Sequence, residues 1–72
     1  MSTLMIYGAT GYTGRMAARH ATTAGMNPVL AGRDAPRLAA LAGELDVEYR
    51  RFDLDDSATV DAALLGVSAV LN

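Results

Sequence analysis

Apolar and polar positions along this chain follow two alternating patterns. Short apolar runs predict four strands, at residues 3–7, 28–31, 47–52 and 67–71. Between them, apolar residues at helical spacing predict three helices, at residues 12–24, from the residue after Asp34, and from about Ser57 to Gly66. Strands that alternate with helices need crossover connections, so the pattern predicts an α/β fold with a parallel sheet.

Local signals support the helix ends. Gly25 follows the first helical pattern and readily takes the left-handed conformation that ends a helix. Asp34 is a good N-cap for the second helix, which has Pro36 in its first turn. Because crossovers of this kind are almost always right-handed, we expect strand order 3-2-1-4 in a partial Rossmann fold, a doubly wound sheet in a three-layer α/β/α arrangement. We expect residues 1–72 to be the N-terminal part of such a domain, cut in or just after its fourth strand.

Composition excludes several classes of function. Hydrophobic residues make up 51% of the 72 residues, and the net charge is −2. The lack of cysteine removes disulfides and thiolate chemistry, and the lack of lysine removes a P-loop and a Tyr-x-x-x-Lys pair. His20 has no ligand partner at metal-binding spacing, so we expect no metal site. Without a basic patch, a long apolar run or a signal segment, we expect no nucleic acid, no membrane and a cytoplasmic location.

The first predicted strand runs through a glycine turn into the first predicted helix. Gly8, Gly11 and Gly14 are spaced Gly-x-x-Gly-x-x-Gly, which moves the second glycine by one position from the usual dinucleotide fingerprint. Gly8 allows a tight turn, Gly11 leaves room for a pyrophosphate, and Gly14 allows close packing of the helix on the sheet. The backbone N–H groups at the helix start, including that of Tyr12, would bind the phosphates. The other interpretation is that these glycines only shape a tight turn.

Hydroxyl groups in the same turn could add hydrogen bonds to the phosphates. Thr10 and Thr13 are placed to do so.

The end of the second predicted strand bears on the choice of cofactor. Sites for NAD usually have an acidic residue here, but this chain has Gly32 followed by Arg33, whose guanidinium suits a phosphate. The sequence therefore favours NADP over NAD, unless Arg33 is an ordinary solvated side chain. Asp34 could bind a ribose hydroxyl or only cap the next helix. Asp53 and Leu54 follow the third strand, where an adenine ring would lie; Asp53 could bind its amino group or be a loop residue.

Three stretches carry a family resemblance that covers essentially the whole chain. Residues 5–15 (MIYGATGYTGR), 30–34 (LAGRD) and 70–72 (VLN) resemble the N-terminus of the saccharopine-dehydrogenase-like oxidoreductases, which include trans-acting enoyl reductases. The second stretch is extended by Arg37, Leu38, Ala40 and Leu41 in the following predicted helix. The resemblance implies an NAD(P)-binding Rossmann domain that begins a longer oxidoreductase, with the catalytic residues beyond this chain. The cofactor contacts that it implies are Gly8, Thr10, Gly11, Tyr12, Thr13, Gly14 and Arg33.

The glycine motif is shared with another group of proteins. Atypical short-chain dehydrogenases of the NmrA and isoflavone-reductase kind have it as well. The alternative function is therefore a non-catalytic NADP-sensing or interaction module.

The fourth predicted strand lies at the edge of the expected sheet. Its apolar side chains and unpaired backbone groups favour pairing with another chain. We therefore expect the chain to self-associate through this edge.

Overall fold

The computed structural model of the chain describes residues 3–53, 55, 64, 66–67 and 69–71. Its elements are β1 (Leu4–Tyr7), α1 (Tyr12–Thr23), β2 (Val29–Gly32), α2 (Ala35–Leu45), β3 (Tyr49–Arg51) and β4 (Ala69–Leu71). All three strand pairings are parallel, in the order β3-β2-β1-β4. The predicted α/β fold and its strand order are therefore confirmed. The predicted third helix, which would form the third layer, falls mainly on residues outside the described part.

β3 and β4 begin two residues later than predicted because neighbouring turns take the first residues. The N–H of Val47 donates to the carbonyl of Ala42 at 3.0 Å, so Val47 lies in the turn that follows the C-cap of α2. Likewise, the N–H of Val67 donates to the carbonyl of Leu64 at 3.0 Å across Gly66, whose φ is +78°. These two hydrogen bonds close turns, and the pairing of β3 and of β4 with the neighbouring strand begins only after these turns.

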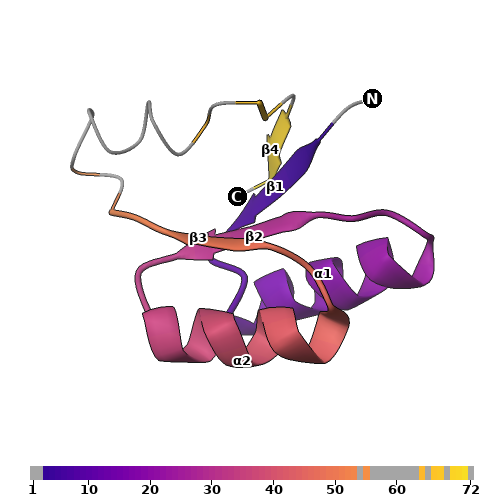
Figure 1. Cartoon of the computed structure of the whole chain (residues 1–72), viewed down its shortest axis with the longest axis horizontal. Coiled ribbons are helices and arrows are strands. Elements are labelled where there is room, and N and C mark those ends of the chain that lie inside the picture. Colours follow the sequence, from indigo (N-terminus) through magenta and orange to yellow (C-terminus); the bar gives the residue numbers. More distant parts are fainter. Residues whose placement is uncertain (1–2, 54, 56–63, 65, 68, 72) are drawn as a thin grey trace.

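The sheet has an apolar cluster on each face. Both helices lie on the same side of the sheet (Figure 1), where Leu38 and Leu41 of α2 and Ala18 of α1 pack with Ile6 and Leu30. The other face carries a second cluster of buried residues with half-buried neighbours: Met5, Val29, Ala31 and Phe52, with Tyr7, Leu64 and Val67 against them. Burial on both faces explains the continuous apolar runs of β1 and β2.

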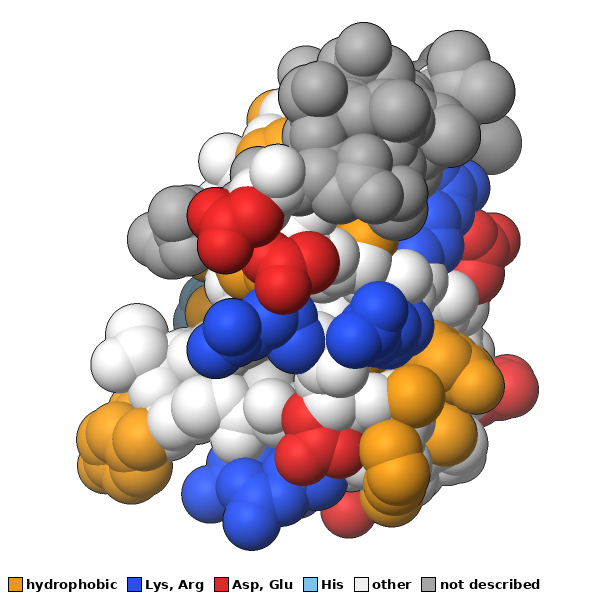
Figure 2. Space-filling model, turned by 90° about the vertical axis from the view of Figure 1, so that its left-hand side faces the viewer, with side chains coloured by type: hydrophobic (Ala, Val, Ile, Leu, Met, Phe, Trp, Pro, Cys, Tyr) orange, Lys and Arg blue, Asp and Glu red, His pale blue; other side chains and the backbone are white. Residues whose placement is uncertain are grey.

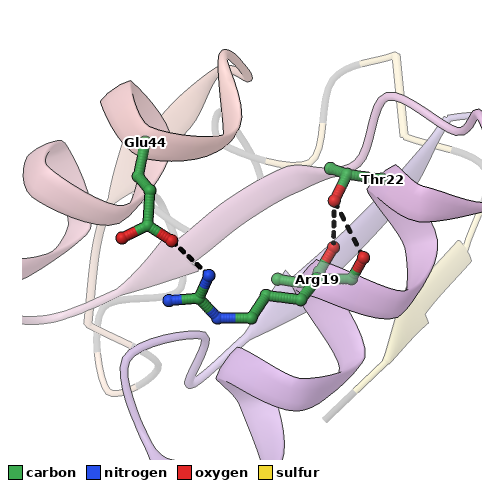
Figure 3. A network of polar contacts seen from close by, with 4 residues as sticks. Arg19, Thr22 and Glu44 are labelled. Carbon is green, nitrogen blue, oxygen red and sulfur yellow. Dashed lines mark hydrogen bonds and ion pairs between the residues drawn. The ribbon is translucent and has the colours of Figure 1, made fainter.

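A surface ion pair joins α1 to α2, and hydrogen bonds close the end of α1. The guanidinium of Arg19 forms an ion pair with the carboxylate of Glu44, which joins the two helices (Figure 3). After the C-cap of α1, Gly25 takes φ +86°, its N–H donates to Thr22, and the N–H of Met26 donates to Ala21. This is the hydrogen-bond pattern of a Schellman motif, so the predicted role of Gly25 is confirmed. Neither α1 nor α2 has the length and apolar character that crossing a bilayer requires, and the described residues include no other helix.

Candidate functional site

The turn between β1 and α1 is tied to the neighbouring strand. Gly8 has φ +77°, a conformation that residues with a side chain rarely adopt. The N–H groups of Gly8 and Ala9 both donate to the carbonyl of Ala31, at 2.9 and 3.2 Å, and the N–H of Gly11 donates to the carbonyl of Gly8 at 3.0 Å. The carboxyl end of β1 thus turns sharply while it stays attached to β2.

Gly14 is required by the packing of the protein itself. A Cβ at this position would lie 2.2 Å from the carbonyl oxygen of Gly8 and 2.8 Å from the Cα of Ala9. Both are backbone atoms, which cannot move aside as a flexible side chain would. Helix α1 can therefore lie this close to the turn only with glycine here, as the sequence predicts.

Gly11 differs from Gly14 because no packing contact of the described residues requires a glycine there. Its φ is −73°, which any residue adopts, and an added Cβ would contact only the Gly8 carbonyl oxygen, at an ordinary 3.4 Å. A side chain at this position would point into open space at the start of α1. The missing side chain leaves the backbone open to a ligand here, and a pyrophosphate approaches the backbone at this position in dinucleotide sites.

The N-terminus of α1 presents backbone donors. Gly11 is the N-cap, no side chain of the described residues caps the helix, and the first helical bond runs from the N–H of Arg15 to the carbonyl of Gly11 at 2.9 Å. The N–H groups of Tyr12, Thr13 and Gly14 consequently have no acceptor among the described residues. Together with the helix dipole, these three groups suit an anion.

A groove of about 520 Å³ opens beside this helix end. Its walls combine the turn with the ends of β1 and β4 and the first turns of α1: Ile6, Tyr7, Gly8, Gly11, Tyr12, Thr13, Gly14, Ala17 and Leu71. Five of the residues predicted to bind cofactor line this groove. The other four lining residues were not predicted as site residues: Ile6, Tyr7, Ala17 and Leu71. Parallel pairing of Ile6 with Leu71 brings the ends of their strands together.

Thr10, in contrast, lies outside this groove. It lines a separate hollow of about 370 Å³ between α1 and α2, together with Arg15, Arg19 and Arg37. The structure thus divides the predicted turn residues between two adjoining surfaces.

Charged residues surround the carboxyl ends of β2 and β3. Figure 2, which looks onto the left-hand side of Figure 1, shows basic and acidic side chains next to one another there. Arg33 is exposed directly after β2. Asp34 caps α2, because its Oδ1 accepts from the N–H of Arg37 at 3.1 Å while its Oδ2 lies 3.6 Å from the Arg37 Nε. Capping is therefore the interpretation of Asp34 that is confirmed.

The loop after β3 holds the predicted adenine contact. Asp53 is half-buried, and its Oδ1 accepts from the N–H of Asp55 at 3.0 Å, as expected of a loop residue. Contact of Asp53 with an adenine ring stays a prediction, and Leu54 lies outside the described residues. The Tyr7 hydroxyl donates to the carbonyl of Phe52 at 3.1 Å, so the start of this loop is held beside the end of β1.

Comparison with known proteins agrees with this geometry. A model for the NAD(P)H-binding family matches residues 8–72, and the chain belongs to this family. No protein with a curated description matches. A solved nucleoside-diphosphate-sugar epimerase from Pseudomonas aeruginosa is 35% identical, with a TM-score of 0.83 over 96% of this chain and 22% of its own.

Two solved oxidoreductases are similar as well. One, of the short-chain dehydrogenase/reductase family from Burkholderia thailandensis, is 31% identical, with a TM-score of 0.82 over 96% of this chain and 30% of its own. The other, a short-chain type dehydrogenase/reductase from Mycobacterium ulcerans, is 22% identical and shows the fold alone (TM-score 0.84; 92% of this chain, 27% of its own). The chain therefore spans about a third or less of these relatives. It has a Rossmann-type fold, and its family is one of NAD(P)H-binding domains, which supports a nicotinamide dinucleotide as the cofactor.

Proposed function

We propose that the chain is the NADP(H)-binding N-terminal part of a Rossmann domain in a saccharopine-dehydrogenase-like oxidoreductase. The pyrophosphate would lie on the N–H groups of Tyr12, Thr13 and Gly14, in the space that Gly11 leaves open. The bound nicotinamide would carry the hydride, and the chain itself would bind and orient the cofactor. Residues that act on a substrate would belong to parts of the enzyme beyond this chain.

The preference for NADP rests on the residues at the carboxyl end of β2. Gly32 ends the strand without a side chain, and the Asp34 carboxylate is engaged by the N–H of Arg37. The strand itself therefore ends without a carboxylate that could accept from a ribose 2′-hydroxyl, and the acidic residue that follows, Asp34, serves as the cap of α2. Arg33 is exposed at this point, and its planar guanidinium can bind a 2′-phosphate through two parallel hydrogen bonds. This arrangement is the observation that supports NADP most directly.

Titration of the chain with NADPH and NADH tests this proposal. We expect NADPH to bind more tightly to the wild type, and Arg33→Ala to remove the difference. Loss of a charge-assisted hydrogen bond weakens binding by about tenfold to a hundredfold. NADH affinity should stay unchanged in the variant, which controls for folding. Equal affinities in the wild type would contradict the preference for NADP.

We also propose that β4 pairs with a second copy of the chain. β4 is an outer strand of the described sheet, and its Val70 and Leu71 side chains are 48% and 47% exposed. Sedimentation velocity should show a mass that increases with concentration in the wild type and a monomer in Val70→Lys. Met26→Lys, which alters another exposed apolar side chain, should behave as the wild type does. A wild-type monomer at every concentration would contradict this pairing.

A further inference from the structure

A side chain of β3 fixes the main chain of Arg33. The parallel register places Arg51 opposite Gly32, and the Nε of Arg51 donates to the carbonyl oxygen of Arg33 at 3.0 Å. The contact joins two residues that are 18 positions apart in the sequence.

This contact begins where the backbone ladder stops. The last ladder bond between these strands runs from the N–H of Phe52 to the carbonyl of Gly32, at 3.0 Å. Arg33 is the next residue, and its carbonyl is beyond the reach of the ladder. The Arg51 side chain therefore extends the attachment of β2 to β3 by one peptide group.

The contact also completes the restraint of the peptide group after Arg33. On the other side, Asp34 is held as the N-cap of α2, since its carbonyl accepts from the N–H of Leu38 at 2.9 Å and its side chain accepts from the N–H of Arg37. Arg33 thus lies between two anchored residues, and the Arg51 Nε holds the peptide that joins Arg33 to the second of them. Fewer main-chain conformations of Arg33 mean fewer directions for its guanidinium, which lowers the cost of ordering it on a ligand.

We propose that Arg51 is a positioning residue for cofactor preference, acting on the adenosine 2′-phosphate through the main chain of Arg33. This inference rests on the proposed preference for NADP. Arg51 carries no role in binding the pyrophosphate, which lies at the start of α1. Its removal should therefore weaken NADPH binding and leave NADH binding as it is.

Substitutions of nearly equal size separate the hydrogen bond from the charge. In Arg51→Gln, an amide nitrogen takes the place of Nε on Cδ, so the donor stays and the charge is lost. In Arg51→Met, both are lost. Arg51→Lys keeps the charge but has a carbon where Nε was. Arg50→Met is the control for net charge, since it removes an arginine from the adjacent position of the same strand.

The readout is the ratio of the Kd for NADH to the Kd for NADPH, measured on one preparation of each variant. Partial unfolding weakens both cofactors equally and leaves this ratio unchanged, so poor folding cannot imitate the effect. We expect Arg51→Met and Arg51→Lys to lower the ratio by about threefold to tenfold, as loss of one hydrogen bond does. Arg51→Gln and Arg50→Met should stay within about twofold of the wild type by the same measure.

A double-variant cycle distinguishes action through Arg33 from direct contact with the phosphate. If Arg51 acts through Arg33, Arg51→Met should lower the ratio no further in a chain that already has Arg33→Ala. An unchanged ratio in Arg51→Met would overturn the inference, as would an equal loss in Arg51→Gln or a further loss in the Arg33→Ala background. A wild type without preference would contradict the proposed function itself, whereas a preference that Arg33→Ala removes and Arg51→Met keeps would overturn this inference alone.

Discussion

Substitution by alanine should affect different properties at Gly11 and at Gly14. If the glycines only shaped a tight turn, both substitutions would act on stability. The structure assigns them different roles, because a Cβ at residue 14 collides with backbone atoms whereas a Cβ at residue 11 meets one atom at an ordinary distance. We therefore expect Gly14→Ala to impair folding and Gly11→Ala to impair cofactor binding.

The magnitudes follow from the two environments. Inserting a methyl group into packed surroundings costs about 1–3 kcal/mol, and the contacts of 2.2 to 2.9 Å at Gly14 favour the upper end. Alanine returns about 1 kcal/mol through its higher helix propensity, so Gly14→Ala should lose about 2 kcal/mol. A domain of this size has a stability of about 4–11 kcal/mol, and such a loss lowers Tm by about 8–16 °C.

Gly11→Ala adds a methyl group on the surface at the start of α1. Alanine is a poorer N-cap than glycine, which costs at most about 1 kcal/mol. The methyl group would occupy the position where a pyrophosphate approaches the helix, and loss of one hydrogen bond to a charged group costs about 1.5–3 kcal/mol. We expect Kd for NADPH to rise by about tenfold or more.

Thermal unfolding by circular dichroism and titration of NADPH fluorescence measure the two effects separately. The expected pattern is a large fall in Tm with Gly14→Ala, and a small fall in Tm with a large rise in Kd with Gly11→Ala. Unchanged NADPH affinity in Gly11→Ala would refute the reasoning, since it would leave the turn as the only reason for this glycine.

Two further predictions concern the helix ends. Asp34→Ala removes the N-cap of α2 and should reduce stability by about 0.5–2 kcal/mol in urea unfolding; an unchanged midpoint would show that the cap is dispensable. Gly25→Ala forces a side chain into φ +86° and should cost about 1–2 kcal/mol. Gly43→Ala is its control, since that helical position is open and alanine there should stabilise by up to about 1 kcal/mol.

The fold was predictable because its determinants are local. Apolar runs give the strands, Asp34 and Gly25 mark helix ends, and the handedness of crossovers gives the strand order. Two strand starts were misplaced because the deciding bonds, from Val47 to Ala42 and from Val67 to Leu64, connect apolar residues that look like strand. No periodicity distinguishes an apolar residue in a turn from one in a strand.

The glycine motif was enough to predict where the site lies, but not the role of each residue in it. Spacing alone does not tell which glycine serves packing and which serves a ligand, because that depends on the approach of Gly14 to the Gly8 carbonyl. The contact of Arg51 with the Arg33 carbonyl depends on the register of β2 with β3, which the sequence leaves open. Such contacts between distant residues become visible only when the strands are paired.

The central claim is that a diphosphate binds the backbone N–H groups at the start of α1. Amide chemical shifts of the ¹⁵N-labelled chain, followed by NMR during titration with NADPH, test it most directly. We predict that the amides of Tyr12, Thr13 and Gly14 shift most and reach saturation together with the binding curve. Saturable binding that leaves these three amides unmoved, or no binding at all, would contradict the account.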